Sequence, residues 1–335
     1  MARDKLIVWI GWMAALSALL LVVALFSLGV GAVALPWRKI PLLLFHGRGT
    51  AEYAILFQVR LPRVLLGAAV GGALAIAGVM LQGMFRNPLV EPYTLGISGG
   101  AALGVCINMI FRKGPLGTLS TPLSGFLGAM GAVLLVYALS VRGGEIRLTR
   151  LLLIGVMVSF MTSSLIMLLM AVSRVEALHG IVFWIMGSLE EPDPSLIRIM
   201  AITSVGGLAL ASLFTVELNA LSLGEEEAFH LGVKVERVKR VLFLLASFLT
   251  GVCVSVTGII GFVGLVVPHL MRLLVGGDHR ILLITSYLGG AAFLILCDTL
   301  ARIIIAPVEL PVGVITGIIG GGVFIYALSK RRYQL

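Results

Sequence analysis

Few residues of this chain have the types and the spacing that chemistry requires. The three cysteines, Cys106, Cys253 and Cys297, are isolated in apolar stretches. Their number and wide spacing fit neither a disulfide framework nor a metal site, so we expect them to be packing residues. The five histidines are equally scattered, and none lies at helical spacing from another with a carboxylate nearby. We therefore expect no metal to be bound by this chain.

The motifs of catalysis and of nucleotide binding are missing from the sequence. It has no G-x-x-x-x-G-K-[ST] phosphate loop, no H-E-x-x-H and no G-x-S-x-G. Asp298 is the main carboxylate inside an apolar segment, and Arg302 follows it at a spacing that pairs side chains on a helix. We expect a structural ion pair near the outer end rather than a proton relay, because an unpaired charge in lipid is costly.

Two segments combine cations with prolines at predicted helix ends. Arg60-Leu61-Pro62-Arg63 starts a helix, with Pro62 suited to the first turn. Its cations fit either headgroup anchoring or docking of an acidic partner. The segment from Arg86 to Tyr93 contains two prolines four residues apart, which end one helix just before the next begins. This tight corner fits either a gate or a simple helix hairpin.

The longest polar segment, 217–240, places apolar residues at helical spacing among charges. This pattern is typical of a short amphipathic helix. Such a helix could sit in a groove of another protein or lie on the membrane surface, and the residues leave both alternatives open. The apolar residues are Leu221, Leu223, Phe229 and Leu231.

The elements that must position these residues are membrane helices. The chain has 335 residues, of which 59% are hydrophobic and 12% charged, and its mean hydropathy is +1.10. This is more apolar surface than a soluble domain could bury, and apolar windows of about twenty residues recur along the chain. We therefore expect a single transmembrane domain over 1–335. The net charge of +9 is attributed to anchoring at the membrane surface rather than to nucleic acid.

The hydropathy pattern predicts about ten helices and an amino terminus in the cytoplasm. With this orientation most Lys and Arg residues fall on the cytoplasmic side, as the positive-inside rule requires. The segment 264–275 is too short to cross alone and contains Pro268, so we expect a half-helix packed inside the protein. The predicted spans are 6–30, 62–85, 93–111, 121–141, 149–172, 196–216, 240–262, 264–275, 281–301 and 312–329, with a further short helix at 177–187.

Two sets of small residues recur every four positions within the predicted spans. Each set forms a smooth stripe along a helix, which in lipid usually marks close helix contact. The stripes fit either internal packing or contact with a second subunit. They are Gly67, Gly71 and Ala75 in one span, and Gly313, Gly317 and Gly321 in another.

Several blocks in order along nearly the whole chain resemble one family, the FecCD-type permeases of ATP-binding-cassette importers for ferric siderophores, haem and cobalamin. This resemblance implies an all-α membrane protein with the cobalamin-permease-like fold of about ten helices, assembled as a homodimer. The blocks are Arg60 to Arg63, Gln82 through Asn87-Pro88-Leu89 to Gly96, Gly258 to His269, Asp278-His279-Arg280, and Glu309 to Gly313.

The resemblance also implies partners and a location. Two ATP-binding-cassette ATPase subunits, which hold the ATP and magnesium, would bind the cytoplasmic face. A soluble or lipid-anchored substrate-binding protein would deliver the chelate from outside. The chain itself would bind no cofactor and catalyse no reaction. It would lie in the cytoplasmic (inner) membrane as a multi-pass protein with both termini in the cytoplasm, in contact with lipid and with no nucleic acid.

The resemblance assigns roles to particular residues. Three arginines, Arg60, Arg63 and Arg302, look like those that receive acidic residues of the binding protein, and charge reversal there is expected to weaken docking and leave the fold intact. Asn87 and Leu89 match positions near the inner gate. At a second gate position cobalamin permeases have two small hydroxyl residues, whereas this chain has Leu148 and Thr149. The stretch 218–236 is similar to the coupling helices that fit the ATPase, with Leu223, Gly224, Glu225, Glu226, Ala228, Leu231 and Gly232 as the contact residues.

These expectations define a leading hypothesis and its rivals. The leading hypothesis is a permease subunit that moves a metal chelate, with a ferric siderophore first and haem or cobalamin next, and that is powered by a separate ATPase. The departure at Leu148 and Thr149 argues against cobalamin. An ion-coupled secondary transporter of a small solute is the alternative, and a membrane enzyme is a third. Both rivals lack the carboxylates or motifs they would need.

Overall fold

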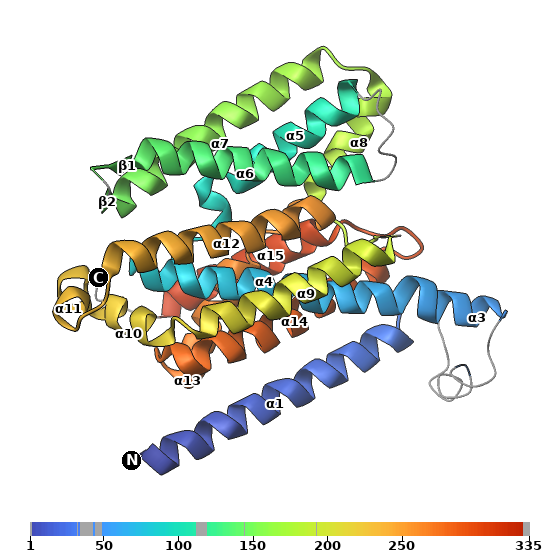
Figure 1. Ribbon diagram of the computed structural model, residues 1–335. Coiled ribbons are helices and arrows are strands. Elements are labelled where there is room, and N and C mark those ends of the chain that lie inside the picture. Colours follow the sequence, from blue (N-terminus) through green and yellow to red (C-terminus); the bar gives the residue numbers. More distant parts are fainter. Residues whose placement is uncertain are drawn as a thin grey trace.

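The computed structural model describes residues 2–31, 33, 43, 49–111, 119–143, 145–191 and 193–330, and these residues are almost entirely helical (Figure 1). The segment between the first two predicted spans, 31–61, lies partly outside these ranges, and residues 331–332 lie wholly outside them.

Seven helical segments in the described part of the chain are long and apolar enough to cross a membrane. Three shorter apolar helices account for the remaining predicted spans, and α8 (Val175–Met186) confirms the predicted short helix. The long segments are α1 (Ala2–Gly29), α3 (Ala51–Ala54) continued through η2 (Ile55–Arg60) into α4 (Leu61–Phe85), α6 (Ser120–Ser140), α7 (Leu148–Ala171), α9 (Pro194–Ser212), α12 (Val235–Thr257) and α14 (His279–Ile303); the shorter ones are α5 (Ile97–Phe111), α13 (Val263–Val275) and α15 (Val312–Lys330).

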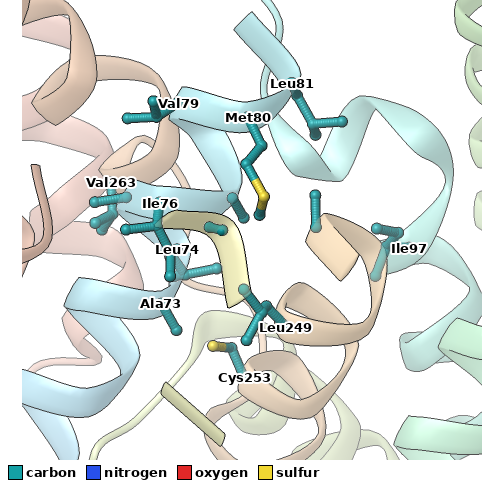
Figure 2. Packing of buried hydrophobic residues seen from close by; sticks show 14 of the residues in the cluster. Ala73, Leu74, Ile76, Val79, Met80, Leu81, Ile97, Leu249, Cys253 and Val263 are labelled. Atoms are coloured by element: carbon teal, nitrogen blue, oxygen red, sulfur yellow. The ribbon is translucent and has the colours of Figure 1, made fainter. Parts of the chain in front are cut away.

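Helix α4 lies at the centre of the molecule and is buried along most of its length. It packs against α9, α12, α13 and α14. Because its small residues let backbones approach, a Cβ added at Gly71 would meet the carbonyl oxygen of Gly290 on α14. The stripe that contains Gly71 therefore packs internally. Figure 2 shows Leu74 and Ile76 of α4 beside Leu249 of α12 in this core.

The second stripe is covered only in part. A Cβ added at Gly313 would meet backbone oxygens of Met186 and Ile259, so this end of α15 packs internally. A Cβ added at Gly317 would meet nothing within 4 Å among the described residues. Contact of this part of α15 with a second subunit stays a prediction.

A separate layer of helices covers one side of the core. Helices α5, α6 and α7 pack together, and α6 contacts α12 of the central group (Figure 1). A two-stranded hairpin joins α6 to α7, with β1 (Val141–Arg142) antiparallel to β2 (Glu145–Ile146). The hairpin thus sets the start of α7, where Leu148 and Thr149 lie.

Helix α1 lies at the edge of the bundle and packs along α14. Hardly any of its apolar residues are buried inside the molecule. An apolar helix with this exposure needs lipid as its solvent, which agrees with the predicted first membrane helix.

The predicted span 240–262 is wrong at its carboxyl end. Helix α12 stops at Thr257, because Gly258 has a positive φ of +70°, and Phe262, just before α13, also has a positive φ of +69°. The next five residues are irregular, and the half-helix α13 begins at Val263 with most of its residues buried, as predicted. Irregular backbone is tolerated at membrane depth only inside protein, and here two hydrogen bonds fasten it to the segment after α4.

Two other predicted spans are interrupted. The span 93–111 is a short 3-10 helix, η3 (Pro92–Leu95), followed by α5, with Gly96 at φ +84° between them. The span 196–216 ends at Ser212, and α10 (Thr215–Leu223) follows after a turn. The segment that was predicted as one short amphipathic helix is therefore two, α10 and α11 (Glu225–His230), separated by Gly224 at φ +150°.

Candidate functional site

Two of the three predicted docking arginines, Arg63 and Arg302, form an ion cluster with two carboxylates. Arg63 donates from Nη2 to Asp298 Oδ1 at 3.1 Å and from Nη1 to Glu309 Oε2 at 2.5 Å. Arg302 Nε lies 3.0 Å from Asp298 Oδ2. The predicted ion pair between Asp298 and Arg302 is confirmed, and Asp298 serves both arginines.

Backbone and hydroxyl oxygens of the α1 end complete this cluster. Arg60 donates to the carbonyl oxygen of Leu28 at 2.7 Å and to that of Val33. Arg302 donates to Ser27 Oγ at 2.6 Å. The cluster therefore ties α1 to α4 and α14 at one end of the molecule.

Burial distinguishes these arginines from an open docking surface. The exposed fractions of Arg60, Arg63 and Arg302 are 3%, 6% and 3%. A role in docking stays a prediction. Because the three side chains are buried, we now expect charge reversal to destabilise the fold as well, since an acid at these positions would be buried beside Asp298 or without a cation.

A cavity of about 590 Å³ opens beside the arginine cluster. Arg63, Glu190 and Glu309 are its charged lining residues, and Phe183 and Trp184 of α8 form an apolar wall. The cluster therefore borders an open space at the end of the molecule that the sequence assigns to the outer side.

The corner after α4 is built by a left-handed cap. Arg86 has φ +51°, and its backbone N–H bonds to Gln82 and Gly83 as the helix ends. Asn87 Oδ1 then accepts a hydrogen bond of 2.9 Å from the backbone N–H of Leu89. This turn leaves the Leu89 side chain exposed.

The second predicted gate position borders the same region. A cavity of about 1090 Å³ is lined by Arg86 from the corner and by Leu148 and Thr149 from the start of α7. Asn87 lines a neighbouring cavity of about 560 Å³, together with Arg86. The structure thus brings the two predicted gate segments to adjoining cavities at one end of the bundle.

The predicted coupling stretch exposes apolar side chains at this end. Ala228 is buried and Gly224 is tightly packed, whereas Leu223 and Leu231 are exposed together with Phe229, which the predicted contact set omitted. Glu225 and Glu226 begin α11 with exposed carboxylates, and Gly232 has φ +86° just after the helix. These side chains lie on the outer side of two short helices that are separated by Gly224. Neither helix is long enough to be stable alone.

Sequence reasoning missed a contact that holds the irregular segment after α12. Glu91 Oε1 accepts a hydrogen bond of 2.6 Å from the backbone N–H of Phe262. The backbone N–H of Ile260 donates to the Tyr93 hydroxyl at 3.4 Å. The corner after α4 is thereby fastened to the entry of α13. The available signal was Glu91, a carboxylate close to two prolines, but the sequence does not indicate that its partner is the backbone of Phe262.

Sequence reasoning also missed Lys239, which lines the 1090 Å³ cavity from α12. It is not among the site residues that the sequence predicts. The spacing of Glu236 and Lys239, three residues apart on a helix, was the signal that could have found it.

The three cysteines are buried, which agrees with their predicted packing role. Within the described ranges, no group of three or more His, Cys, Asp or Glu residues is gathered as a metal site would require.

Comparison with known proteins identifies what the chain resembles. The model of the FecCD transport family matches residues 19–330. The hemin transport system permease protein HmuU of Yersinia pestis is 41% identical over 319 residues, covering 94% of each chain. The Fe(3+) dicitrate transport system permease protein FecD of Escherichia coli is 40% identical over 309 residues, covering 92% of this chain and 95% of its own. A solved inward-facing structure of a metal-chelate type ABC transporter matches with a TM-score of 0.84 and 33% identity, over 96% of this chain and 100% of that one.

Proposed function

Because this chain belongs to the FecCD transport family, we propose that two copies of it form the passage of an ATP-driven importer for an iron chelate. The chain is a membrane-spanning permease subunit of an ABC importer for metal chelates. Relatives at 39–41% identity are named for hemin, cobalamin and ferric dicitrate, which are all metal chelates. The choice of an iron chelate over cobalamin therefore rests on Leu148 and Thr149, which stand where cobalamin permeases have two small hydroxyl residues.

The observation that supports a separate ATPase as the energy source is the exposed apolar surface of α10 and α11. Leu223, Phe229 and Leu231 all point outward from a short loop beside the acidic start of α11. Exposed apolar side chains rimmed by charge are typical of a protein-binding surface. We assign this surface, within the stretch 218–236, to the ATPase subunit, which supplies the ATP and magnesium that this chain has no loop to hold.

The ends of the molecule receive corresponding roles. The start of α1, the hairpin and α11 lie at one end, and α3 and the far end of α5 lie at the other (Figure 1). We propose that the first end is cytoplasmic, with Asn87, Leu89, Leu148 and Thr149 at the inner gate, in a single domain over 1–335 within the inner membrane. The termini then lie in the cytoplasm.

The buried arginine cluster supports a modified docking role. Arg63 and Arg302 pair with Asp298 and Glu309, whereas Arg60 donates to backbone oxygens, so the cluster itself has one positive charge in excess; Glu190 on the cavity wall is a carboxylate outside the cluster. We propose that this excess attracts an acidic binding protein across the surface, rather than by direct contact of all three guanidinium groups. Association should then weaken with salt.

Reconstitution of the permease with its ATPase and binding protein in proteoliposomes tests this function. Hemin, ferric dicitrate and a ferric hydroxamate are the probes, and both uptake and ATP hydrolysis are measured. We expect one iron chelate to stimulate hydrolysis and to accumulate only when ATP is present. Accumulation driven by an ion gradient in vesicles without the ATPase would overturn the proposal in favour of a secondary carrier.

A matched pair of variants tests the assigned ATPase surface. Phe229→Ala removes an exposed ring from α11, and Phe111→Ala removes an equally exposed ring from the end of α5. We expect Phe229→Ala to weaken co-purification of the ATPase while Phe111→Ala leaves it unchanged. Equal retention in both variants would place the ATPase contact elsewhere.

A further inference from the structure

Lys239 is a fully buried cation at the cytoplasmic end. It lies in the second turn of α12, and only 2% of the residue is exposed. A lysine is rarely buried to this degree unless it is paired, because removing an ammonium from water is costly. The contacts that offset this cost therefore identify what Lys239 holds.

The Nζ atom of Lys239 joins three separate pieces of backbone. It lies 2.8 Å from Glu225 Oε2 of α11 and 2.5 Å from Glu236 Oε1 in the first turn of α12. It also donates to the carbonyl oxygen of Ile146 in β2 at 3.0 Å. Two hydrogen bonds, to Glu225 and Ile146, and the ion pair with Glu236 therefore stabilise the buried ammonium.

Glu236 forms a second arm to the same hairpin residue. Its Oε2 accepts a hydrogen bond of 2.7 Å from the backbone N–H of Ile146. Both backbone groups of Ile146 are therefore held by the Lys239–Glu236 pair, although Ile146 also faces Val141 across the hairpin. Leu148 begins α7 two residues later.

These contacts connect the proposed ATPase surface to the proposed gate. Glu225 begins α11, whose outer side carries Phe229. From Glu225 the path runs through one ammonium to Ile146 and then along two residues to Leu148. Figure 1 shows α11, the start of α12 and the hairpin at the same end of the molecule.

We propose that Lys239 is a positioning residue that makes α11 and the β1–β2 hairpin move as one unit, so that displacement of α11 by the ATPase is passed to Leu148 and Thr149. The inference rests on the proposed function, since it requires an ATPase on α11. Without Lys239 the backbone of Ile146 would keep its hydrogen bond to the Glu236 carboxylate, and α11 would lose its charged link to the hairpin.

Neutralisation of the ammonium tests the link in the reconstituted importer. Lys239→Met keeps the length of the side chain and removes the charge, Lys239→Arg keeps the charge, and Arg240→Met removes an exposed charge one residue further on. The readout is the number of ATP molecules hydrolysed per chelate taken up. We expect this ratio to rise roughly tenfold in Lys239→Met, within the range for groups in one ion-pair network. Lys239→Arg should recover part of the coupling, and Arg240→Met should match the unmodified chain.

Gate movement provides a readout that loss of stability alone would not change. A spin label at Thr149→Cys reports the separation of the two gate segments in the dimer, because the native cysteines are buried. The change in this separation on ATP binding should shrink in Lys239→Met. If Lys239→Met shows the same ATP-induced change in separation and the same ATP-to-chelate ratio as the unmodified chain, the proposal is overturned. This holds whether or not the unfolding temperature falls, and Lys239 then has a structural role only.

A second variant keeps the test valid if Lys239→Met does not fold. Glu225→Gln removes the link from Lys239 to α11 while Lys239 retains Glu236 and Ile146, and co-purification of the ATPase checks that the predicted contact of Glu225 with it is kept. We expect Glu225→Gln to uncouple hydrolysis in the same direction and the double variant to add little to it. Additive effects would contradict the link. Failure of the unmodified complex to couple ATP to uptake would contradict the proposed function instead.

Discussion

Replacement of Asp298 by asparagine should destabilise the protein more than any other single neutralisation in the arginine cluster. Asp298 is 2% exposed, and its two oxygens lie 3.1 and 3.0 Å from Arg63 and Arg302. At an effective dielectric constant of about 20, each contact is worth roughly 5 kcal/mol, most of which offsets desolvation of the ions. Asparagine keeps the shape and removes the charge that both guanidinium groups need.

The expected loss in the free energy of unfolding is about 3–5 kcal/mol, the cost of leaving a buried charge without its partner. Glu309→Gln provides the matched control, because Glu309 also binds Arg63 but is 39% exposed. Water can replace that partner, so the expected loss is about 1 kcal/mol or less. The two neutralisations therefore differ several-fold for the same change of charge.

Equilibrium unfolding in detergent micelles, followed by far-UV circular dichroism, measures both losses. A third variant, Asp298→Asn with Arg302→Met, removes one charge of each sign and should recover part of the stability lost by Asp298→Asn. Equal losses for Asp298→Asn and Glu309→Gln would refute the reasoning, because burial would then have no effect on the value of the pair.

Other parts of the molecule give three further predictions. Gly71→Leu should lower the free energy of unfolding by about 1–3 kcal/mol by overpacking against α14, whereas Gly131→Ala on α6, where a Cβ meets nothing within 4 Å, should have little effect in the same micelle assay. The hydrogen bond from Arg280 holds the pKa of Asp278 well below its usual value, so this carboxyl stabilises the folded state above about pH 4 and loses that effect as the pH falls further. Asp278→Asn keeps the cap of α14 and should remove this acid dependence; an unchanged pH profile of unfolding would contradict it. Leu231→Asp should reduce ATPase binding and leave the unfolding temperature unchanged, since Leu231 is exposed; a large drop in that temperature would show a structural role.

Hydropathy was sufficient to place the membrane helices but not to find where their hydrogen bonding stops. Ile259, Ile260 and Phe262 are apolar, so the predicted span ran on past Thr257. The helix ends because Gly258 adopts positive φ, and hydrogen bonds to two side chains of the segment after α4 hold the irregular residues beyond it. Such bonds join residues about 170 positions apart, and periodicity within a window contains no information about them.

For the candidate site too, the sequence predicted which residues matter better than it predicted their long-range contacts. The sequence identified Arg60, Arg63 and Arg302 as cations on an unexpected side, yet their burial depends on α1 and α14. It identified the Asp298–Arg302 pair because both residues lie on one helix. Lys239 was not predicted because its burial depends on contacts with residues outside its own helix, above all the hydrogen bond to the carbonyl oxygen of Ile146, 93 positions away.

The arginine cluster also orders events during synthesis. Arg63 enters the membrane with α4, but its partner Asp298 follows 235 residues later and Glu309 follows 246 residues later. At about 5–20 residues per second, the ribosome needs roughly 10–50 seconds to make that stretch. During this interval Arg63 must interact with lipid headgroups or water, and the helices can pack around the arginine cluster only after α14 has been inserted. Truncation before α14 should therefore yield an inserted but unlocked intermediate that membrane proteases and chaperones can reach.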